Sequence, residues 1–161
     1  MVPDSARNLW DIPNLLMQKF PAEEFVATVK FSFEPKTDGE KFGLVVMGMS
    51  YANIAVTKRA DGAYISYTSC LEADKGKPEV EKQISRAGSG PDLYFRVRVN
   101  KGAVCTFSYS NDGRTFTEIA EKFTAAPGRW IGATMGLFRS RTHTIHPADF
   151  NVLDRFVVAA A

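Results

Sequence analysis

The sequence predicts an all-β protein, a two-sheet antiparallel jelly-roll sandwich, because apolar residues recur with a period of two and turn residues recur at short, even spacing. In residues 24–34, Phe25, Val29 and Phe31 alternate with polar residues. Residues 93–100 repeat this alternation. Successive strand residues point to opposite faces, so each segment is expected to have one buried face and one exposed face.

The remaining strands follow from shorter apolar runs, which are separated by turn signals such as Asp61-Gly62 and Asn111-Asp112-Gly113. Glycine, Asn and Asp tolerate the positive φ that tight hairpins need. These strands are expected at residues 15–20, 42–49, 51–58, 63–73, 79–86, 103–110, 115–122, 129–138 and 148–158. No helix of useful length is expected, since Pro13 interrupts the only helical run, residues 6–16.

Composition fits one β-sandwich domain over residues 1–161, with 45% hydrophobic and 24% charged residues. A net charge of +2 gives no electrostatic case for nucleic acid. The chain has neither a signal-peptide pattern nor an apolar run of about 20 residues, so no membrane partner is expected and the compartment stays open. The predicted core is Phe25, Val29, Phe31, Leu44, Val46, Ile54, Leu93, Phe95, Val97, Phe107, Ile131, Met135 and Phe156.

Cys70 and Cys105 both lie in apolar, strand-like segments, so two buried thiols are favoured over one disulfide between neighbouring strands. Residues 110–116 read Ser-x-Asp-Gly-x-x-Phe, a hairpin in which Asp112 bonds the turn backbone and Phe116 is expected to anchor the hairpin to the core. This motif predicts structure and not chemistry.

Catalytic and metal-binding patterns are weak, so no catalytic or metal residue is assigned. Glu72 and Asp74, and likewise Glu79 and Glu81, share strand faces but mix with lysines, as on a solvated hairpin rim. The pair of histidines, His143 and His146, lies in a basic loop without further ligands nearby in sequence. No cofactor is expected. A structural calcium ion remains an open alternative, for which oxygens are available from Asp38, Asp112, Asp149 and Asp154, although no loop has calcium-binding spacing.

The aromatic residues outside the phenylalanine core suggest carbohydrate binding, in which rings stack on sugar C–H faces and polar groups fix the hydroxyls. Tyr94 is notable because it shares a strand face with Arg96 and Arg98. The opposing interpretation is that these rings belong to the core. The candidate carbohydrate-binding residues are Trp130, Tyr94, Arg96, Tyr67, Tyr51 and Trp10.

Several segments, in this order, resemble the C-terminal concanavalin A-like β-sandwich of family 43 glycoside hydrolases, which are mostly β-xylosidases and α-arabinofuranosidases. The resemblance covers about residues 9–158 and is carried by residues 13–21, 25–28, 43–48, 93–97, 105–110, 112–113, 128–133, 136–138 and 148–150. Two departures stand out. Ser50 replaces an acidic residue that usually precedes the Tyr-Ala pair, and Asn151, Val152 and Leu153 interrupt the usual compact last strand.

The resemblance implies an accessory module. In that family the catalytic carboxylates belong to a preceding β-propeller, so none transfers to this chain. Trp130 is the best match to a loop aromatic that the module can place near the active-site mouth. Three functions follow: a non-catalytic carbohydrate-binding module for plant polysaccharides such as xylan, a purely structural domain that docks on a catalytic β-propeller, and, least favoured, an independent jelly-roll glycosidase.

Overall fold

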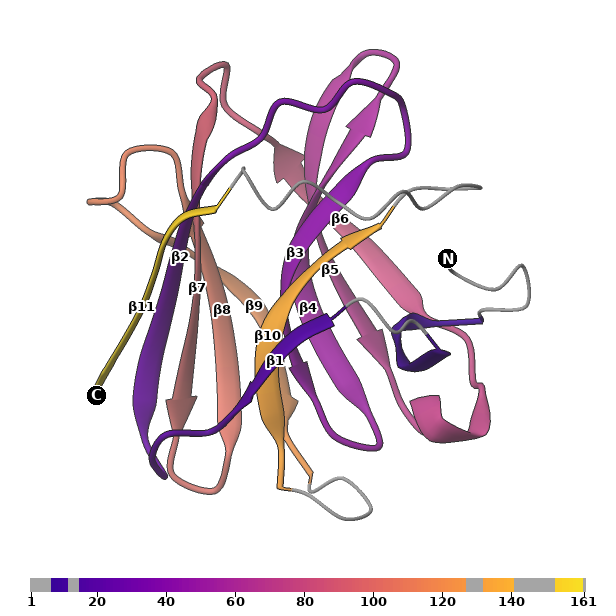
Figure 1. The fold of residues 1–161 in the computed structure, drawn as a ribbon, viewed down its shortest axis with the longest axis vertical. Coiled ribbons are helices and arrows are strands. Elements are labelled where there is room, and N and C mark those ends of the chain that lie inside the picture. The colour runs from indigo at the N-terminus through magenta and orange to yellow at the C-terminus, as the bar shows by residue number, and fades with distance from the viewer. Residues whose placement is uncertain (1–6, 12–14, 127–131, 141–152, 161) are drawn as a thin grey trace.

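The computed structural model describes residues 7–11, 15–126, 132–140 and 153–160, and these form two antiparallel sheets packed face to face (Figure 1). The six-stranded sheet has the order β1 (Leu15–Lys19), β10 (Thr134–Ser140), β3 (Lys41–Met47), β4 (Tyr51–Arg59), β5 (Gly62–Cys70), β6 (Val80–Arg86). The five-stranded sheet has the order β11 (Leu153–Ala160), β2 (Phe25–Ser32), β7 (Asp92–Asn100), β8 (Val104–Ser110), β9 (Thr117–Thr124). The predicted all-β sandwich is confirmed.

Some strands begin or end at other residues than predicted, because a turn or a side-chain hydrogen bond replaces the backbone hydrogen bonds to the neighbouring strand. The strand β5 ends at Cys70, three residues before the expected end, because Glu72 adopts a left-handed conformation (φ 53°) and leads into a short 3₁₀ helix, η2 (Ala73–Lys75). The strand β9 begins at Thr117, because the N–H of Thr115 bonds the side chain of Asp112 instead of a neighbouring strand. Residues 129–131, expected in β10, lie outside the described residues.

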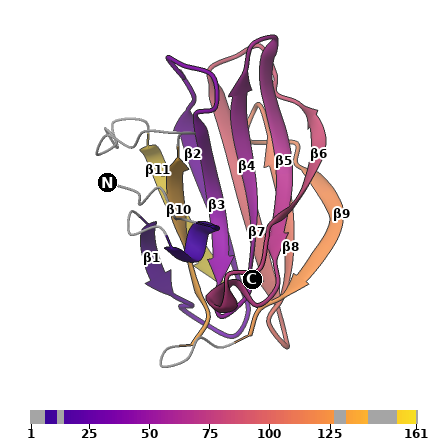
Figure 2. The same ribbon diagram turned by 90° about the vertical axis from the view of Figure 1, so that its right-hand side faces the viewer.

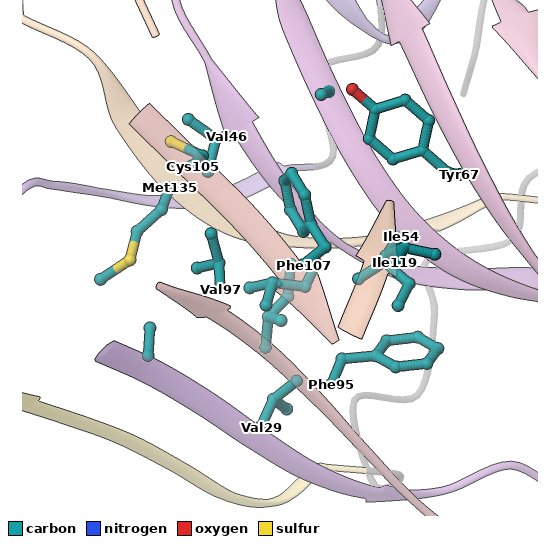
Figure 3. Packing of buried hydrophobic residues seen from close by; sticks show 14 of the residues in the cluster. Val29, Val46, Ile54, Tyr67, Phe95, Val97, Cys105, Phe107, Ile119 and Met135 are labelled. Carbon is teal, nitrogen blue, oxygen red and sulfur yellow. The ribbon is translucent and has the colours of Figure 1, made fainter. Parts of the chain in front are cut away.

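The core lies between the sheets (Figure 3). It is built mainly from every second residue of the strands, as the alternation of apolar residues predicted. In β2 every second residue is buried, from Phe25 to Phe31. The Phe31 ring joins the sheets, with its centroid 4.3 Å from that of Phe42 and 5.0 Å from that of Phe95. The predicted core residues are buried except Phe156, which is half-buried against the core, and Ile131, which lies outside the described residues.

The outer face of the six-stranded sheet carries a second, smaller apolar cluster, at the end where the two short helices lie together (Figure 2). Leu9 of η1 (Leu9–Asp11) and Ala73 of η2 pack there on Val45 and Tyr51. Within the described part of the chain, no helix has the length and hydropathy that crossing a bilayer requires.

The cysteines are two free, buried thiols, as the sequence favoured. Cys70 lies in the outer cluster and Cys105 in the core, so the two belong to different sheets and different clusters. Burial raises the pKa of the Cys105 thiol to about 12, which keeps this thiol protonated and unreactive at neutral pH.

Candidate functional site

The candidate site lies on the outer face of the five-stranded sheet, where β7 presents Tyr94, Arg96 and Arg98 away from the core. Their neighbours along the strand, Phe95 and Val97, are fully buried. Tyr94 and Arg96 are half-buried, whereas Arg98 is exposed. The alternation that builds the core therefore places an aromatic ring and two guanidinium groups on one surface.

The guanidinium group of Arg96 is held in position by two contacts. Its central carbon lies 3.5 Å from the centroid of the Phe116 ring, a close cation–π stack. Its Nε donates a hydrogen bond to the Thr28 hydroxyl oxygen at 3.0 Å. The stack also shows that the expected core position of Phe116 was wrong: Phe116 precedes β9, and its ring covers an outward-facing arginine instead of joining the core.

The hairpin that carries Phe116 is fixed by its own side chains, as the Ser-x-Asp-Gly pattern predicted. The Ser110 hydroxyl accepts the N–H of Gly113 at 2.9 Å, and Asp112 Oδ1 accepts the N–H groups of Arg114 and Thr115 at 2.8 and 2.9 Å. These bonds stabilise the charged carboxylate and lower the pKa of Asp112 to about 2. The site thus includes a rigid hairpin.

Gly113 brings the hairpin backbone directly against Tyr94. Its φ is +73°, and a Cβ atom at this position would lie 2.7 Å from two carbons of the Tyr94 ring. Only glycine combines this backbone conformation with so close an approach. The hairpin thereby fixes one edge of the Tyr94 ring.

A second positive charge, that of Arg98, lies beside Arg96. Burial, followed by the charge of Arg98, lowers the pKa of Arg96. Thr106 on β8 pairs with Arg98 on one side and with Lys122 of β9 on the other, so Lys122 lies two strands from Arg98 on the same face. Lys30 and Asp92 form an ion pair at 3.3 Å at the other end of the face.

Tyr51, a predicted sugar contact, is instead fully buried, which corrects the expectation of an exposed ring. Its hydroxyl donates a hydrogen bond to Glu79 Oε1 and accepts the N–H of Leu9 at 3.0 Å. Burial and the Glu79 carboxylate raise the pKa of the Tyr51 hydroxyl far above its usual range. Tyr51 therefore anchors η1 and the start of β6 to the sheet.

Two further candidates with described side chains, Tyr67 and Trp10, lie away from Tyr94. Tyr67 is 6% exposed and packs edge-on against Phe107 in the core at a centroid distance of 5.9 Å (Figure 3), which agrees with the opposing interpretation that this ring belongs to the core. Trp10 is half-buried against the outer cluster of the six-stranded sheet. Trp130 lies outside the described residues. Of the five candidates that the structure describes, Tyr94 and Arg96 are brought together, and sugar binding by any of the six remains a prediction.

Sequence reasoning missed a group of buried polar side chains on the outer face of the six-stranded sheet. Both amide atoms of Asn53 and the hydroxyls of Thr57 and Ser66 are buried and have no hydrogen-bond partner among the described residues. The register pairs Asn53 with Thr68 and Ala55 with Ser66, which makes Asn53 and Ser66 diagonal neighbours on β4 and β5. The one sign of this group in the sequence is Asn53, a polar residue within the otherwise apolar segment that forms the first part of β4.

The paired carboxylates are engaged by other side chains of the protein. Glu72 pairs with Lys75, and Glu81 pairs with Lys41 at 2.7 Å and Arg59 at 3.7 Å. Together with the Glu79–Tyr51 bond, these contacts match the predicted rim of the hairpin. Among the described residues, no group of three or more His, Cys, Asp or Glu side chains is arranged to hold a metal ion. His143, His146 and Asp149 lie outside those residues.

The chain matches the family described as the β-xylosidase C-terminal concanavalin A-like domain over residues 3–154. No match was found among the curated proteins. Among solved structures, a GH43 glycoside hydrolase engineered to display endo-xylanase and exo-arabinofuranosidase activity is similar with a TM-score of 0.76 at 19% identity, over 96% of this chain and 32% of that one. A bifunctional GH43-CE protein of Bacteroides eggerthii has a TM-score of 0.76 at 17% identity, over 96% and 20% of the two chains.

The xylan β-1,4-xylosidase of Bacillus halodurans has a TM-score of 0.68 at 14% identity, over 89% of this chain and 29% of that one. At these identities the likeness shows a shared fold, and this chain spans a third or less of each of the three enzymes. The match to the family covers nearly the whole sequence and agrees with the two-sheet architecture. The chain belongs to the family of β-xylosidase C-terminal concanavalin A-like domains.

Proposed function

We propose that this chain is a non-catalytic, carbohydrate-binding accessory module of a xylan-active glycoside hydrolase, and that the sugar binds on the outer face of β7. The observation that carries the proposal is the Tyr94–Arg96–Phe116 arrangement, in which partly exposed rings adjoin an arginine whose terminal amino groups make no hydrogen bond to the described residues. Aromatic faces with a few placed polar groups are the usual form of a saccharide or small-ligand site. The family membership supports the association with xylan.

Affinity is expected to be weak, because a shallow, wet surface offers few fully desolvated contacts. The test is a calorimetric titration with xylohexaose of the wild-type protein and of the Tyr94→Ala and Trp130→Ala variants. The matched control is Tyr64→Ala, since Tyr64 lies on the other sheet and likewise contacts arginines, Arg59 at 5.2 Å and Arg86 at 5.8 Å from its ring centroid. The proposal expects heat in the wild type and the control and its loss in Tyr94→Ala. An absence of heat with every xylo-oligosaccharide tried at millimolar concentration contradicts it.

A second function, docking on a catalytic β-propeller, is favoured by exposed apolar side chains at one end of the six-stranded sheet. Leu71 and Val80 are 67% and 68% exposed, and both lie where β5 ends and β6 begins. Exposed apolar side chains that lie close together can form a surface that another domain covers, and the register Ser69↔Val80 places Val80 near Leu71. Val80→Asp and Leu71→Asp are expected to weaken association with a separately produced propeller domain, measured by sedimentation, and unchanged association would contradict docking through this end.

A further inference from the structure

Arg96 and Arg98 differ from the arginines that pair with carboxylates within the described part of the chain. Arg7 pairs with Asp11 at 3.2 Å, and Arg139 pairs with Glu40 at 2.8 Å. In the same described residues, neither Arg96 nor Arg98 meets a carboxylate, although they lie two residues apart on one strand face. Placing two like charges side by side without a counter-ion is unfavourable unless an anion joins them.

The guanidinium group of Arg96 is prepared to receive an anion. The Phe116 stack fixes its plane, and the Nε bond to Thr28 fixes its rotation. Both terminal amino groups keep their donors available, because the Nε bond is the one hydrogen bond that Arg96 makes among the described residues. A guanidinium fork presents parallel N–H donors that match the two oxygens of a carboxylate.

The surroundings limit competition from the protein's own carboxylates. Asp92, at the far end of β7, is engaged by Lys30. Asp112 directs its Oδ1 into the hairpin backbone. Across the sheet, Arg96 pairs with Ser108 on β8, and Ser108 pairs with Glu118 on β9. Glu118 is therefore two strands away from Arg96, a separation of about 10 Å at ordinary strand spacing. Within the described part of the chain, Arg96 is therefore not engaged by a carboxylate, and Arg98 lies beside it, so an external carboxylate can pair with both.

We infer that this face binds an acidic saccharide, namely a uronic acid carried on a xylan-type chain. The carboxylate pairs with Arg96 and Arg98, and the sugar ring lies along Tyr94. A neutral sugar can accept hydrogen bonds from these guanidinium groups but brings no charge to pair with them, whereas a uronate uses the charge and the ring surface together. This inference rests on the proposed carbohydrate-binding function and specifies the class of ligand at the same site.

The test compares three saccharides by calorimetry with the whole chain: a xylo-oligosaccharide bearing one glucuronic acid, the same oligosaccharide with its carboxyl group reduced to the alcohol, and xylohexaose. The acidic form is expected to bind at least tenfold more tightly than the reduced form. This advantage decreases as ionic strength rises, because salt screens charge pairs at the surface. Arg96→Gln and Arg98→Gln are each expected to remove most of the advantage, while Arg59→Gln, on the other sheet and paired with Glu81, preserves it.

Each outcome has a distinct meaning. Equal affinity for the acidic and reduced forms overturns the inference and leaves the proposed function standing. No binding of any of the three overturns the proposed function itself. Competition by inorganic sulfate at millimolar concentration, as strong as that of the acidic saccharide, overturns the assignment to a sugar and leaves a general anion site. Circular dichroism of each variant verifies that a lost signal does not come from unfolding.

Discussion

The two outer faces of the sandwich differ in how far their aromatic side chains are covered, as a tyrosine on each face shows. On the six-stranded sheet, Tyr51 is fully buried under η1, and its hydroxyl contacts Leu9 and Glu79. On the five-stranded sheet, Tyr94 is half-buried, and one edge of its ring meets Gly113. Both tyrosines alternate with core residues in the same manner. The segment that covers each face, and not the strand itself, decides which ring is available to a ligand.

The largest expected effect is the loss of Tyr51. Tyr51→Ala removes a buried ring and leaves a cavity under η1, which is expected to lower the free energy of unfolding by about 3–5 kcal/mol. Tyr94→Ala is the matched variant on the other face and is expected to cost about 1 kcal/mol, because that ring is already partly exposed to water. Urea denaturation measures both. An equal decrease in the free energy of unfolding for both variants would show that the two tyrosines stabilise the fold equally, which would contradict the comparison.

Gly113→Ala is expected to destabilise the protein by about 1–2 kcal/mol and to weaken sugar binding in parallel. The new methyl group would meet the Tyr94 ring, and the positive φ is unfavourable for alanine. Gly102→Ala is the matched control, because it shares the positive φ but has nothing within 4 Å of its Cβ position. If both variants bind sugar equally well, the hairpin does not shape the site.

Asn53→Leu is expected to stabilise the protein by about 1 kcal/mol, since an unpaired buried amide costs free energy that an apolar side chain of similar shape does not. Thermal unfolding of the variant measures the effect. The control is Asn8→Leu, which is expected to destabilise, because the Asn8 amide donates to the carbonyls of Ala73 and Lys77. Destabilisation by Asn53→Leu would indicate that ordered water or a ligand bonds this amide.

Asp112→Asn is expected to have the smallest effect, visible mainly in its pH dependence. The pKa of Asp112 is lowered from 3.8 to about 2 in the folded protein, so its charge stabilises the fold above about pH 4, and this contribution is lost as the pH falls towards 2. The stability difference between wild type and variant should therefore be largest near neutral pH and vanish near pH 2. A difference that does not change with pH would contradict the role of the charge. Urea midpoints across this range provide the measurement.

The sequence by itself determined the sandwich, most strand positions and the hairpin at 110–116, because these depend on alternation and on turn chemistry that neighbouring residues carry. It also placed Tyr94, Arg96 and Arg98 on one face, since residues two apart on a strand always share a side. The tertiary structure alone decided that Tyr51 and Tyr67 are buried and that Phe116 stacks on Arg96. Those outcomes depend on contacts between segments far apart in the chain, such as Leu9 with Tyr51, which no local pattern encodes.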